Sequence, residues 1–368
     1  MMNKMILGNL VHRPIRSLIS IVAVALEVML ILLIVGLSLG LLNDSKSRQA
    51  GIGADVIVMP PGSSFIVGLT GAPMPVKIKD VLAKLPHVVA VAPVITQVST
   101  AGALEVIAGI DLSSYERMSG PFRYLEGGPF QAPDDVLVDD ILARSKHIKV
   151  GDKVEILGNS FRVCGIVEAG KGARKFLQLS ELQDLMGAKD KASIFYLKLD
   201  NPAYADSVAD SVKKIPGMEH YVATSMAYYL SMMTPSNYPG LSSFIRVVIG
   251  IAVIIGFIVI FQAMYTAVME RTREIGILKS MGASKLYIVN VILQETIALA
   301  IGGIILGIVL SLAARAGIVE RIPTIRVIVT GGWILRATGI AIVGAILGAL
   351  YPAYRAAQKD PIEALAYE

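Results

Sequence analysis

The sequence has 368 residues, of which 54% are hydrophobic and 17% charged, and its mean hydropathy is +0.64. Soluble domains rarely have this composition, so we expect a membrane protein. The net charge of +5 is modest, and the basic residues gather near the ends of apolar runs, which argues against nucleic-acid binding. The single cysteine, Cys164, permits no internal disulfide and says nothing of the compartment.

Four apolar runs are long enough to cross the bilayer core, which takes ~20 helical residues. They lie at 18–42, 244–269, 286–314 and 333–350. The first run is too long for a signal-peptide core, and no small-residue cleavage site follows it, so we expect a retained helix. The sequence therefore predicts an α-helical membrane protein with four transmembrane helices, one before and three after a long insert.

The insert, residues 43–240, has mixed composition with proline and glycine punctuation and is predicted to be an extracytoplasmic α+β domain. At roughly 200 residues it is long enough for its own core, which we expect to form two lobes. Strands are predicted at 54–59, 88–92, 94–98, 104–110, 153–157 and 161–167, with Asn159 in a hairpin turn after Gly158. Helices are predicted at 78–85, 138–145, 179–186 and 204–215. Residues 1–42 and 241–368 then form the two membrane parts.

No residue pattern in the insert indicates a catalytic site. His87, His147 and His220 lack metal-ligand spacing. An acidic cluster is interpreted as a solvated surface; it consists of Asp134, Asp135, Asp139 and Asp140. The sequence contains no G-x-x-x-x-G-K-[ST] phosphate loop. We therefore expect no enzymatic activity, no metal and no cofactor in this chain.

Basic residues predict the orientation in the membrane. They lie before the first run, between the second and third, and after the fourth: Lys4, Arg13, Arg16, Arg271, Arg273, Lys279, Lys285, Arg355 and Lys359. These segments share one side, which the positive-inside rule makes cytoplasmic, together with both termini. Arg315, Arg321 and Arg326 in the opposite short loop weaken this inference.

Residues 270–282, ERTREIGILKSMG, separate the second and third runs. Ile275, Leu278 and Met281 recur three apart with charges between them, which is typical of a short amphipathic helix at a membrane surface. The alternative is a basic loop that only fixes topology.

Small and polar residues inside the runs provide further candidates. Three pairs of glycines four apart would let helix backbones approach closely, although glycine is also simply common in membrane helices; the pairs are Gly36 and Gly40, Gly303 and Gly307, and Gly344 and Gly348. Glu27 is a carboxyl group inside an apolar helix, a costly position that marks a functional candidate. It would either contact a ligand or serve structurally, as a protonated acid or a partner of Arg246 or of another chain.

A cluster of tyrosines and methionines just before the second run includes Tyr228, Tyr229, Met232 and Met233. Such residues serve as interfacial anchors or line a site for a flat or greasy ligand. With Glu27 they form the candidate ligand contacts.

Several motifs, in this order, resemble the MacB/FtsX-like family of ABC transporter permeases (type VII transporters). In the insert they are GADVIV at 53–58, VLVD at 136–139, KVGD at 149–152 and FRVCGIV at 161–167. Residues 271–284 resemble the segment after the second span, and YPAYRAA at 351–357 with DPIEAL at 360–365 resembles the C-terminal tail.

The resemblance implies a homodimeric permease in the bacterial cytoplasmic membrane, driven by a separate ABC ATPase subunit that binds ATP and Mg. The coupling residues would be Arg271, Arg273, Glu274, Ile275, Ile277, Leu278, Lys279 and Gly282, with Ile275 and Leu278 in the apolar face that meets the ATPase. Work done by the ATPase inside would reach the outside domain by mechanotransmission. The cargo would be hydrophobic or amphipathic (haem, lipid, lipoprotein, antibiotic or peptide), with a periplasmic adaptor as a further partner. The alternatives are an FtsX-like signal transmitter that activates an outside partner such as a cell-wall hydrolase, and a receptor without an ATPase.

Overall fold

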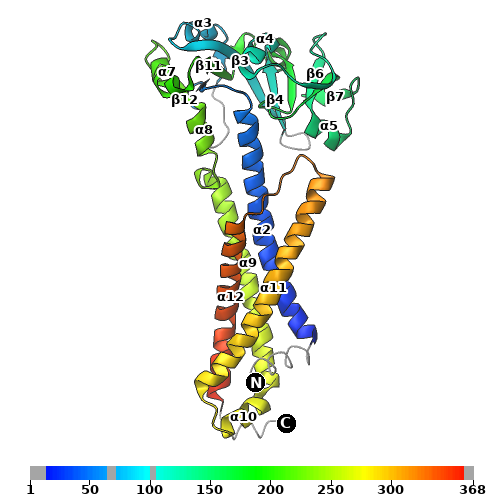
Figure 1. Cartoon of the computed structure of the whole chain (residues 1–368), viewed down its shortest axis with the longest axis vertical. Coiled ribbons are helices and arrows are strands. Elements are labelled where there is room, and N and C mark those ends of the chain that lie inside the picture. Colours follow the sequence, from blue (N-terminus) through cyan, green and yellow to red (C-terminus); the bar gives the residue numbers. More distant parts are fainter. Residues whose placement is uncertain (1–13, 64–71, 100–104, 360–368) are drawn as a thin grey trace. The chain divides into compact units, whose positions relative to one another are not determined.

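The computed structural model describes residues 14–63, 72–99 and 105–359 (Figure 1). Lys4, Arg13 and the tail motif that begins at Asp360 lie outside the described residues, as does the side chain of Arg16. The chain divides into a helical unit, residues 1–39, 240–320 and 327–368, and a sheet unit, residues 40–239 and 321–326.

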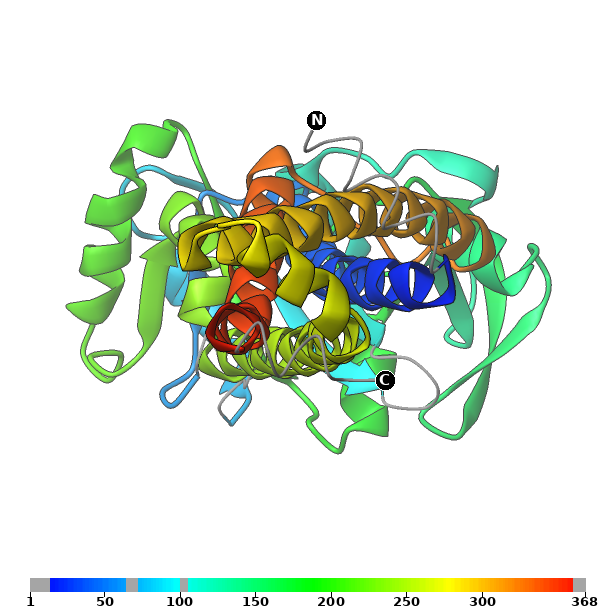
Figure 2. The same ribbon diagram turned by 90° about the horizontal axis from the view of Figure 1, so that it is seen from below.

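Among the described residues, four helices are long and apolar enough to cross a membrane. They are α2 (Pro14–Ala50), α9 (Pro239–Glu270), α11 (Lys285–Arg321) and α12 (Gly331–Gln358), and the short helix α10 (Thr272–Ser280) joins α9 to α11. Each long helix contains one predicted span. Figure 2 shows the helices of this unit from below. The prediction of a helical membrane protein with one helix before the insert and three after it is confirmed.

Small residues form much of the core of the helical unit. Along α12 the buried face is a row of alanines at every fourth position, each at most 3% exposed: Ala337, Ala341, Ala345, Ala349 and Ala353. Branched side chains of α2 and α11, such as Val28 and Ile304, complete the core. α12 begins where the hydroxyl of Thr330 accepts a hydrogen bond from the backbone N–H of Trp333 at 3.4 Å.

The sheet unit contains one mixed sheet of ten strands in the order β12-β1-β11-β3-β4-β9-β6-β8-β5, with β7 paired to β8. The neighbours are antiparallel except β4 with β9 and β6 with β8. The strands are β1 (Val56–Met59), β3 (Val88–Ser99), β4 (Glu105–Ile110), β5 (Tyr124–Gly127), β6 (Asp135–Asp139), β7 (Lys153–Ile156), β8 (Asn159–Val167), β9 (Lys175–Gln178), β11 (Ile194–Leu199) and β12 (Val222–Ser225). A separate pair consists of β2 (Met74–Pro75) and β10 (Lys191–Ala192). One sheet thus continues through the region where two α+β lobes were expected.

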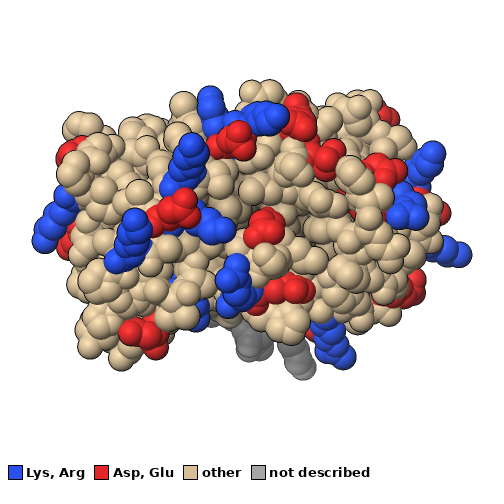
Figure 3. Space-filling view, turned by 90° about the horizontal axis from the view of Figure 1, so that it is seen from above, with Lys and Arg blue, Asp and Glu red and all other residues tan. Residues whose placement is uncertain are grey.

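Short helices pack against this sheet. They are α3 (Ile78–Leu82), α4 (Leu112–Ser119), α5 (Asp140–Lys146), α6 (Leu179–Leu185), α7 (Ala205–Lys213) and α8 (Met226–Met232), with 3-10 turns η1 (Pro202–Tyr204) and η2 (Pro235–Asn237). α7 packs on β1 and β12, and α6 packs on β3, β4 and β9. Acidic and basic side chains are interspersed over the face that Figure 3 shows.

Two local predictions in the insert were wrong, and a predicted helix was found two residues later than expected. Residues 88–98 form one strand, because β3 pairs with β11 up to Val94 and with β4 only from Val94 on, so Pro93 has a paired strand on one side only. The helix predicted at 138–145 begins at Asp140, and Asp139 caps it by accepting from the N–H of Leu142 at 2.7 Å. Asn159 already pairs with Ile156, so the turn itself is Leu157–Gly158, both with positive φ.

The interpretation of the acidic cluster as a solvated surface was also wrong for two of its members. Asp135 and Asp139 are 0% and 1% exposed. Asp135 accepts from the N–H groups of Gln131 and Ala132 and from the guanidinium of Arg162 at 2.8 Å. Buried carboxylates need such partners, because a buried charge without them is costly.

Candidate functional site

Helix α10, the segment singled out by its amphipathic spacing, is the candidate site. The backbone leaves helical geometry at Arg271, between α9 and α10, where φ is −105° and ψ is 18°. The hydroxyl of Thr272 then donates to the carbonyls of Val268 and Met269. α10 ends before Gly282, whose φ of +90° is readily adopted only by glycine. The chain therefore turns sharply at both ends of α10.

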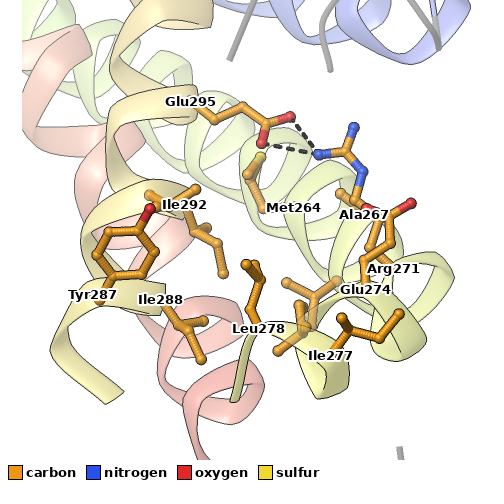
Figure 4. Close-up of a pocket in the computed structure, with 13 residues that line it drawn as sticks. Met264, Ala267, Arg271, Glu274, Ile277, Leu278, Tyr287, Ile288, Ile292 and Glu295 are labelled. Carbon is orange, nitrogen blue, oxygen red and sulfur yellow. Dashed lines mark hydrogen bonds and ion pairs between the residues drawn. The ribbon is translucent and has the colours of Figure 1, made fainter. Parts of the chain in front are cut away.

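One face of α10 is turned toward the other helices of its unit. Gly276 is buried, and Ile275 packs against the helical core. Beside it lies a cavity of about 300 Å³ between α9, α10 and α11, with an apolar lining that includes Leu278, Ile288 and Ile292 (Figure 4). The expected apolar docking pair, Ile275 and Leu278, thus turns inward.

The remaining face of α10 is open, and two of its residues, Glu274 and Ile277, also line the cavity. Arg273 and Glu274 are exposed, as are Ile277 at 44% and Met281 at 71%. This face therefore combines charged groups with two exposed apolar side chains, a composition suited to a protein contact. Of the predicted coupling residues, Arg273, Glu274, Ile277 and Gly282 lie exposed.

A buried ion pair fastens the start of α10 to α11. Nη1 of Arg271 lies 3.1 and 3.3 Å from the two carboxylate oxygens of Glu295. Both side chains are largely buried, at 14% and 10% exposed. Figure 4 shows this pair at one end of the cavity. Removing either partner would leave an uncompensated buried charge.

A lysine fastens the other end of α10 to α12. Nζ of Lys279 donates to the backbone carbonyls of Ala357 at 3.0 Å and of Lys359 at 2.5 Å. These carbonyls belong to the end of α12, where helical C=O groups lack an intrahelical partner. A cation there also complements the helix dipole. α10 is consequently held by both α11 and α12, in addition to its covalent link to α9.

The predicted packing glycines lie at close helix contacts. A Cβ at Gly303 would lie 2.5 Å from Cβ of Val24, and one at Gly307 would lie 2.7 Å from the carbonyl oxygen of Ala25, so α11 and α2 meet backbone to backbone. A Cβ at Gly348 would lie 3.0 Å from the carbonyl oxygen of Phe257 on α9.

The remaining glycines of the predicted pairs have other neighbours. The carbonyl of Gly36 accepts from the N–H of Ile328 at 2.9 Å. A Cβ at Gly344 would lie 4.0 Å from Oε1 of Glu27. Gly40 is buried and belongs to the sheet unit.

Glu27 is 6% exposed, and its Oε1 has no hydrogen-bond partner among the described residues. A Cβ at Gly256 on α9 would lie 2.0 Å from Oε2, so the missing side chain of that glycine provides the space for the carboxyl group. The suggested pair with Arg246 is not formed, since Arg246 is exposed and donates to Ser243 at 3.2 Å.

The tyrosine and methionine cluster is divided between surface and core. Tyr228 is 53% exposed, whereas Tyr229 packs on the sheet core, and burial raises the pKa of its hydroxyl to about 12. Met233 is buried, and the sulfur of Met232 accepts from Asn237 at 3.3 Å. These residues belong to the sheet unit and Glu27 to the helical unit, so the shared ligand site stays a prediction.

Sequence reasoning missed Glu295 as the partner of Arg271. The sequence did offer one signal for Glu295: like Glu27, it is an acidic residue within an apolar span, and such a residue is a candidate for a functional role. Nothing in the linear sequence indicates that Glu295 pairs with Arg271, which lies 24 positions earlier.

Two family models match the chain. The MacB-like periplasmic core domain matches residues 17–215, and the FtsX-like permease C-terminal model matches residues 246–361. The ABC transporter permease YknZ of Bacillus subtilis, itself described as uncharacterised, is 31% identical over 59% of this chain and 55% of its own length. The macrolide export ATP-binding/permease protein MacB of Bdellovibrio bacteriovorus is 28% identical over 60% of this chain and 36% of its own.

A third relative, the pyoverdine export ATP-binding/permease protein PvdT of Pseudomonas syringae pv. tomato, is 28% identical over 92% of this chain and 57% of its own length. The chain thus spans less than two thirds of the length of each of these relatives. Among solved structures, the periplasmic region of MacB from Actinobacillus actinomycetemcomitans is similar with a TM-score of 0.40 and 14% identity, over 50% of this chain and 94% of that one.

Proposed function

We propose a function from the premise that the chain belongs to the MacB/FtsX-like family of ABC transporter permeases. It is a multi-pass membrane subunit that converts ATP hydrolysis by a separate ABC ATPase into movement of its sheet domain, and so exports or extracts a hydrophobic or amphipathic compound. In this proposal ATP and Mg bind the ATPase subunit.

The observation that carries the proposal is that α10 is bound to both α11 and α12 and leaves one face exposed. Its open face presents Ile277 and Met281, while Arg271 and Lys279 bind it to α11 and α12. A partner that pushes on the open face would therefore move three long helices together, because the covalent link to α9 completes the set. A plain topological loop would not need a buried ion pair.

The orientation follows from the same proposal. An ATPase is cytoplasmic, so α10 and both termini face the cytoplasm, and the sheet unit lies outside the cytoplasmic membrane. The basic residues near α10 support this orientation.

The cargo class is supported by the names of relatives. The relatives named for export carry macrolide and pyoverdine in their names. Within the helical unit, α2 and α9 present apolar surface, with Leu26 55% and Ile255 56% exposed. In the proposed assembly, lipid or a second copy of the permease covers this surface.

The test is the double variant Ile277→Asp with Met281→Asp. Both side chains are exposed, so the chain should still fold and insert, whereas two carboxylates should block the apolar contact with the ATPase. The matched control is Leu125→Asp with Val150→Asp, two apolar residues exposed at 49% and 40% in the sheet unit.

The measurements are recovery of a subunit that carries the phosphate loop with the tagged permease, and ATP hydrolysis by the purified complex. The double variant should lose both and the control should keep both. Normal assembly and hydrolysis in the double variant would contradict the proposed coupling surface. Stimulation of hydrolysis by small amphipathic compounds would favour export over signalling, and mass spectrometry of bound molecules would identify the cargo.

A further inference from the structure

A buried network of acidic and basic groups lies in the sheet unit, centred on Arg174. Nη1 of Arg174 donates to Oδ2 of Asp139 at 2.9 Å, and Nη2 donates to Oδ2 of Asp44 at 3.0 Å. Arg174 and Asp44 are each 8% exposed, and Asp139 is 1% exposed. Asp139 ends β6, Arg174 directly precedes β9, and Asp44 lies near the end of α2. One guanidinium therefore joins the sheet to the first long helix.

The end of α2 is fastened to the same place by further contacts. Arg48, one turn after Asp44, forms an ion pair with it and donates from Nε to the carbonyl of Gly172 at 3.3 Å. The N–H of Gly172 donates in return to the carbonyl of Arg48 at 2.9 Å. A Cβ at Gly51 would lie 2.0 Å from the carbonyl oxygen of Gly170. The loop before β9 is thus in direct backbone contact with the end of α2.

Arg174 also reaches a third segment. Its Nη2 lies 3.5 Å from the carbonyl oxygen of Thr324. Thr324 lies in residues 321–326, which connect α11 to α12 and belong to the sheet unit. The segments that meet at Arg174 are therefore continuous in sequence with three long helices, α2, α11 and α12.

The chemistry of the network explains why an arginine is needed. Each buried carboxylate in the network contacts a guanidinium group, so its burial is compensated by a partner of opposite charge. A guanidinium is planar and presents several donors in fixed directions, and can bridge two acids at once, whereas the ammonium of lysine acts as a single point charge. Burial raises the pKa of Asp139, with Arg174 acting in the opposite direction. The ionised state of Asp139 thus depends on the position of Arg174.

We propose that Arg174 is the positioning residue that links the sheet domain to α2 and to the connection between α11 and α12, so that movement of these helices is delivered to the sheet. The inference rests on the proposed function, and it adds the route by which ATP-driven movement reaches the sheet domain. It predicts that the link depends on two-armed bridging by Arg174 and not on its charge alone.

The test uses the variant Arg174→Lys in the complete complex with its ATPase. The control is Arg162→Lys, because Arg162 also forms an ion pair, with Asp135 at 2.8 Å, but is more exposed and joins β8 to β6 within the sheet. Hydrogen exchange is compared in the nucleotide-free complex and in the complex trapped with Mg-ATP and orthovanadate. The readouts are peptides that cover α10 and peptides that cover β6 and β9.

In wild type and Arg162→Lys, trapping should change exchange in both α10 and the sheet peptides. In Arg174→Lys the change in α10 should remain and the change in β6 and β9 should be lost. An unaltered response of the sheet peptides in Arg174→Lys would overturn the inference.

If Arg174→Lys fails to fold, Asp44→Asn takes its place, since it leaves the Arg174–Asp139 pair inside the sheet and weakens only the link to α2. Loss of the sheet response then supports the inference, and its retention overturns it. A wild-type complex with no response in α10 would instead contradict the proposed function itself, and the inference would fall with it.

Discussion

The contact between α11 and α2 gives a prediction that can be worked out from distances. Ordinary van der Waals contact of a Cβ begins near 3.4 Å, whereas a Cβ at Gly303 would lie 2.5 Å from Cβ of Val24 and 2.9 Å from the carbonyl oxygen of Ile21. A backbone oxygen cannot rotate away as a side chain can. We therefore expect Gly303→Ala to push α11 from α2 by about 1 Å, and the separation weakens the dispersion contacts along both helices.

Two opposing effects set the magnitude of this change. Alanine favours helix over glycine by about 1 kcal/mol. Overpacking of a well-packed core costs typically ~1–3 kcal/mol. With three atoms closer than 3.0 Å, one of them a backbone oxygen, we place the cost toward the upper end and expect a net destabilisation of ~1–2 kcal/mol.

The neighbouring Gly302 provides the control. A Cβ there would lie 3.6 Å from the side chain of Ile21, which is an ordinary contact. Gly302→Ala should therefore be neutral, or stabilising by up to ~1 kcal/mol. The free energy of unfolding would be measured by SDS titration in mixed micelles.

A second variant tests the same cause. Gly307→Ala should also destabilise, because a Cβ there would lie 2.7 Å from the carbonyl oxygen of Ala25. The double variant Gly303→Ala with Gly307→Ala should lose less unfolding free energy than the two single variants added together, because one outward shift of α11 relieves both overlaps. Equal stability of Gly303→Ala and Gly302→Ala would refute the reasoning.

Three further predictions follow from the coupling and orientation proposals. A cysteine in place of Asp134 should be labelled by an impermeant reagent from outside the cell, whereas one in place of Lys279 should not, and labelling of the latter would reverse the proposed orientation. Arg271→Glu should lower stability by ~3 kcal/mol or more, and the charge-reversed pair with Glu295→Arg should recover part of it; no recovery in a double-mutant cycle would mean that the ion pair does not couple the two helices. Glu27→Gln keeps the side-chain volume, so stability should be unchanged while cargo-stimulated ATP hydrolysis falls, and unaltered stimulation would remove Glu27 from the cargo site.

The long helices could be predicted from the sequence because their apolar runs are unmistakable, but their ends could not. Hydropathy ends the first span at Leu42, whereas α2 continues to Ala50. The added residues, NDSKSRQA, are polar and mostly charged or hydrogen-bonding, so they carry no hydropathy signal. Their helical state depends on contacts of Asp44 and Arg48 with residues that lie far away in the sequence.

The orientation of α10 shows a different limit. Residues three apart are rotated by about 300° around a helix, so each step of three turns the face by ~60°. Ile275, Leu278 and Met281 therefore do not share one direction: the first packs inward, the second lines the cavity and the third is 71% exposed. The spacing predicted the helix correctly, but which residues are open is decided by the neighbouring helices.

The lone cysteine has a practical consequence. Cys164 is half-buried in β8, where its thiol donates to the carbonyl of Val136 at 3.5 Å, and burial raises its pKa to about 12. Only the thiolate reacts with maleimides and disulfides, and a raised pKa keeps the thiol protonated at pH 7. Cysteines for spin labels, fluorophores and cross-linkers can therefore be introduced into the native sequence one position at a time, without first replacing Cys164.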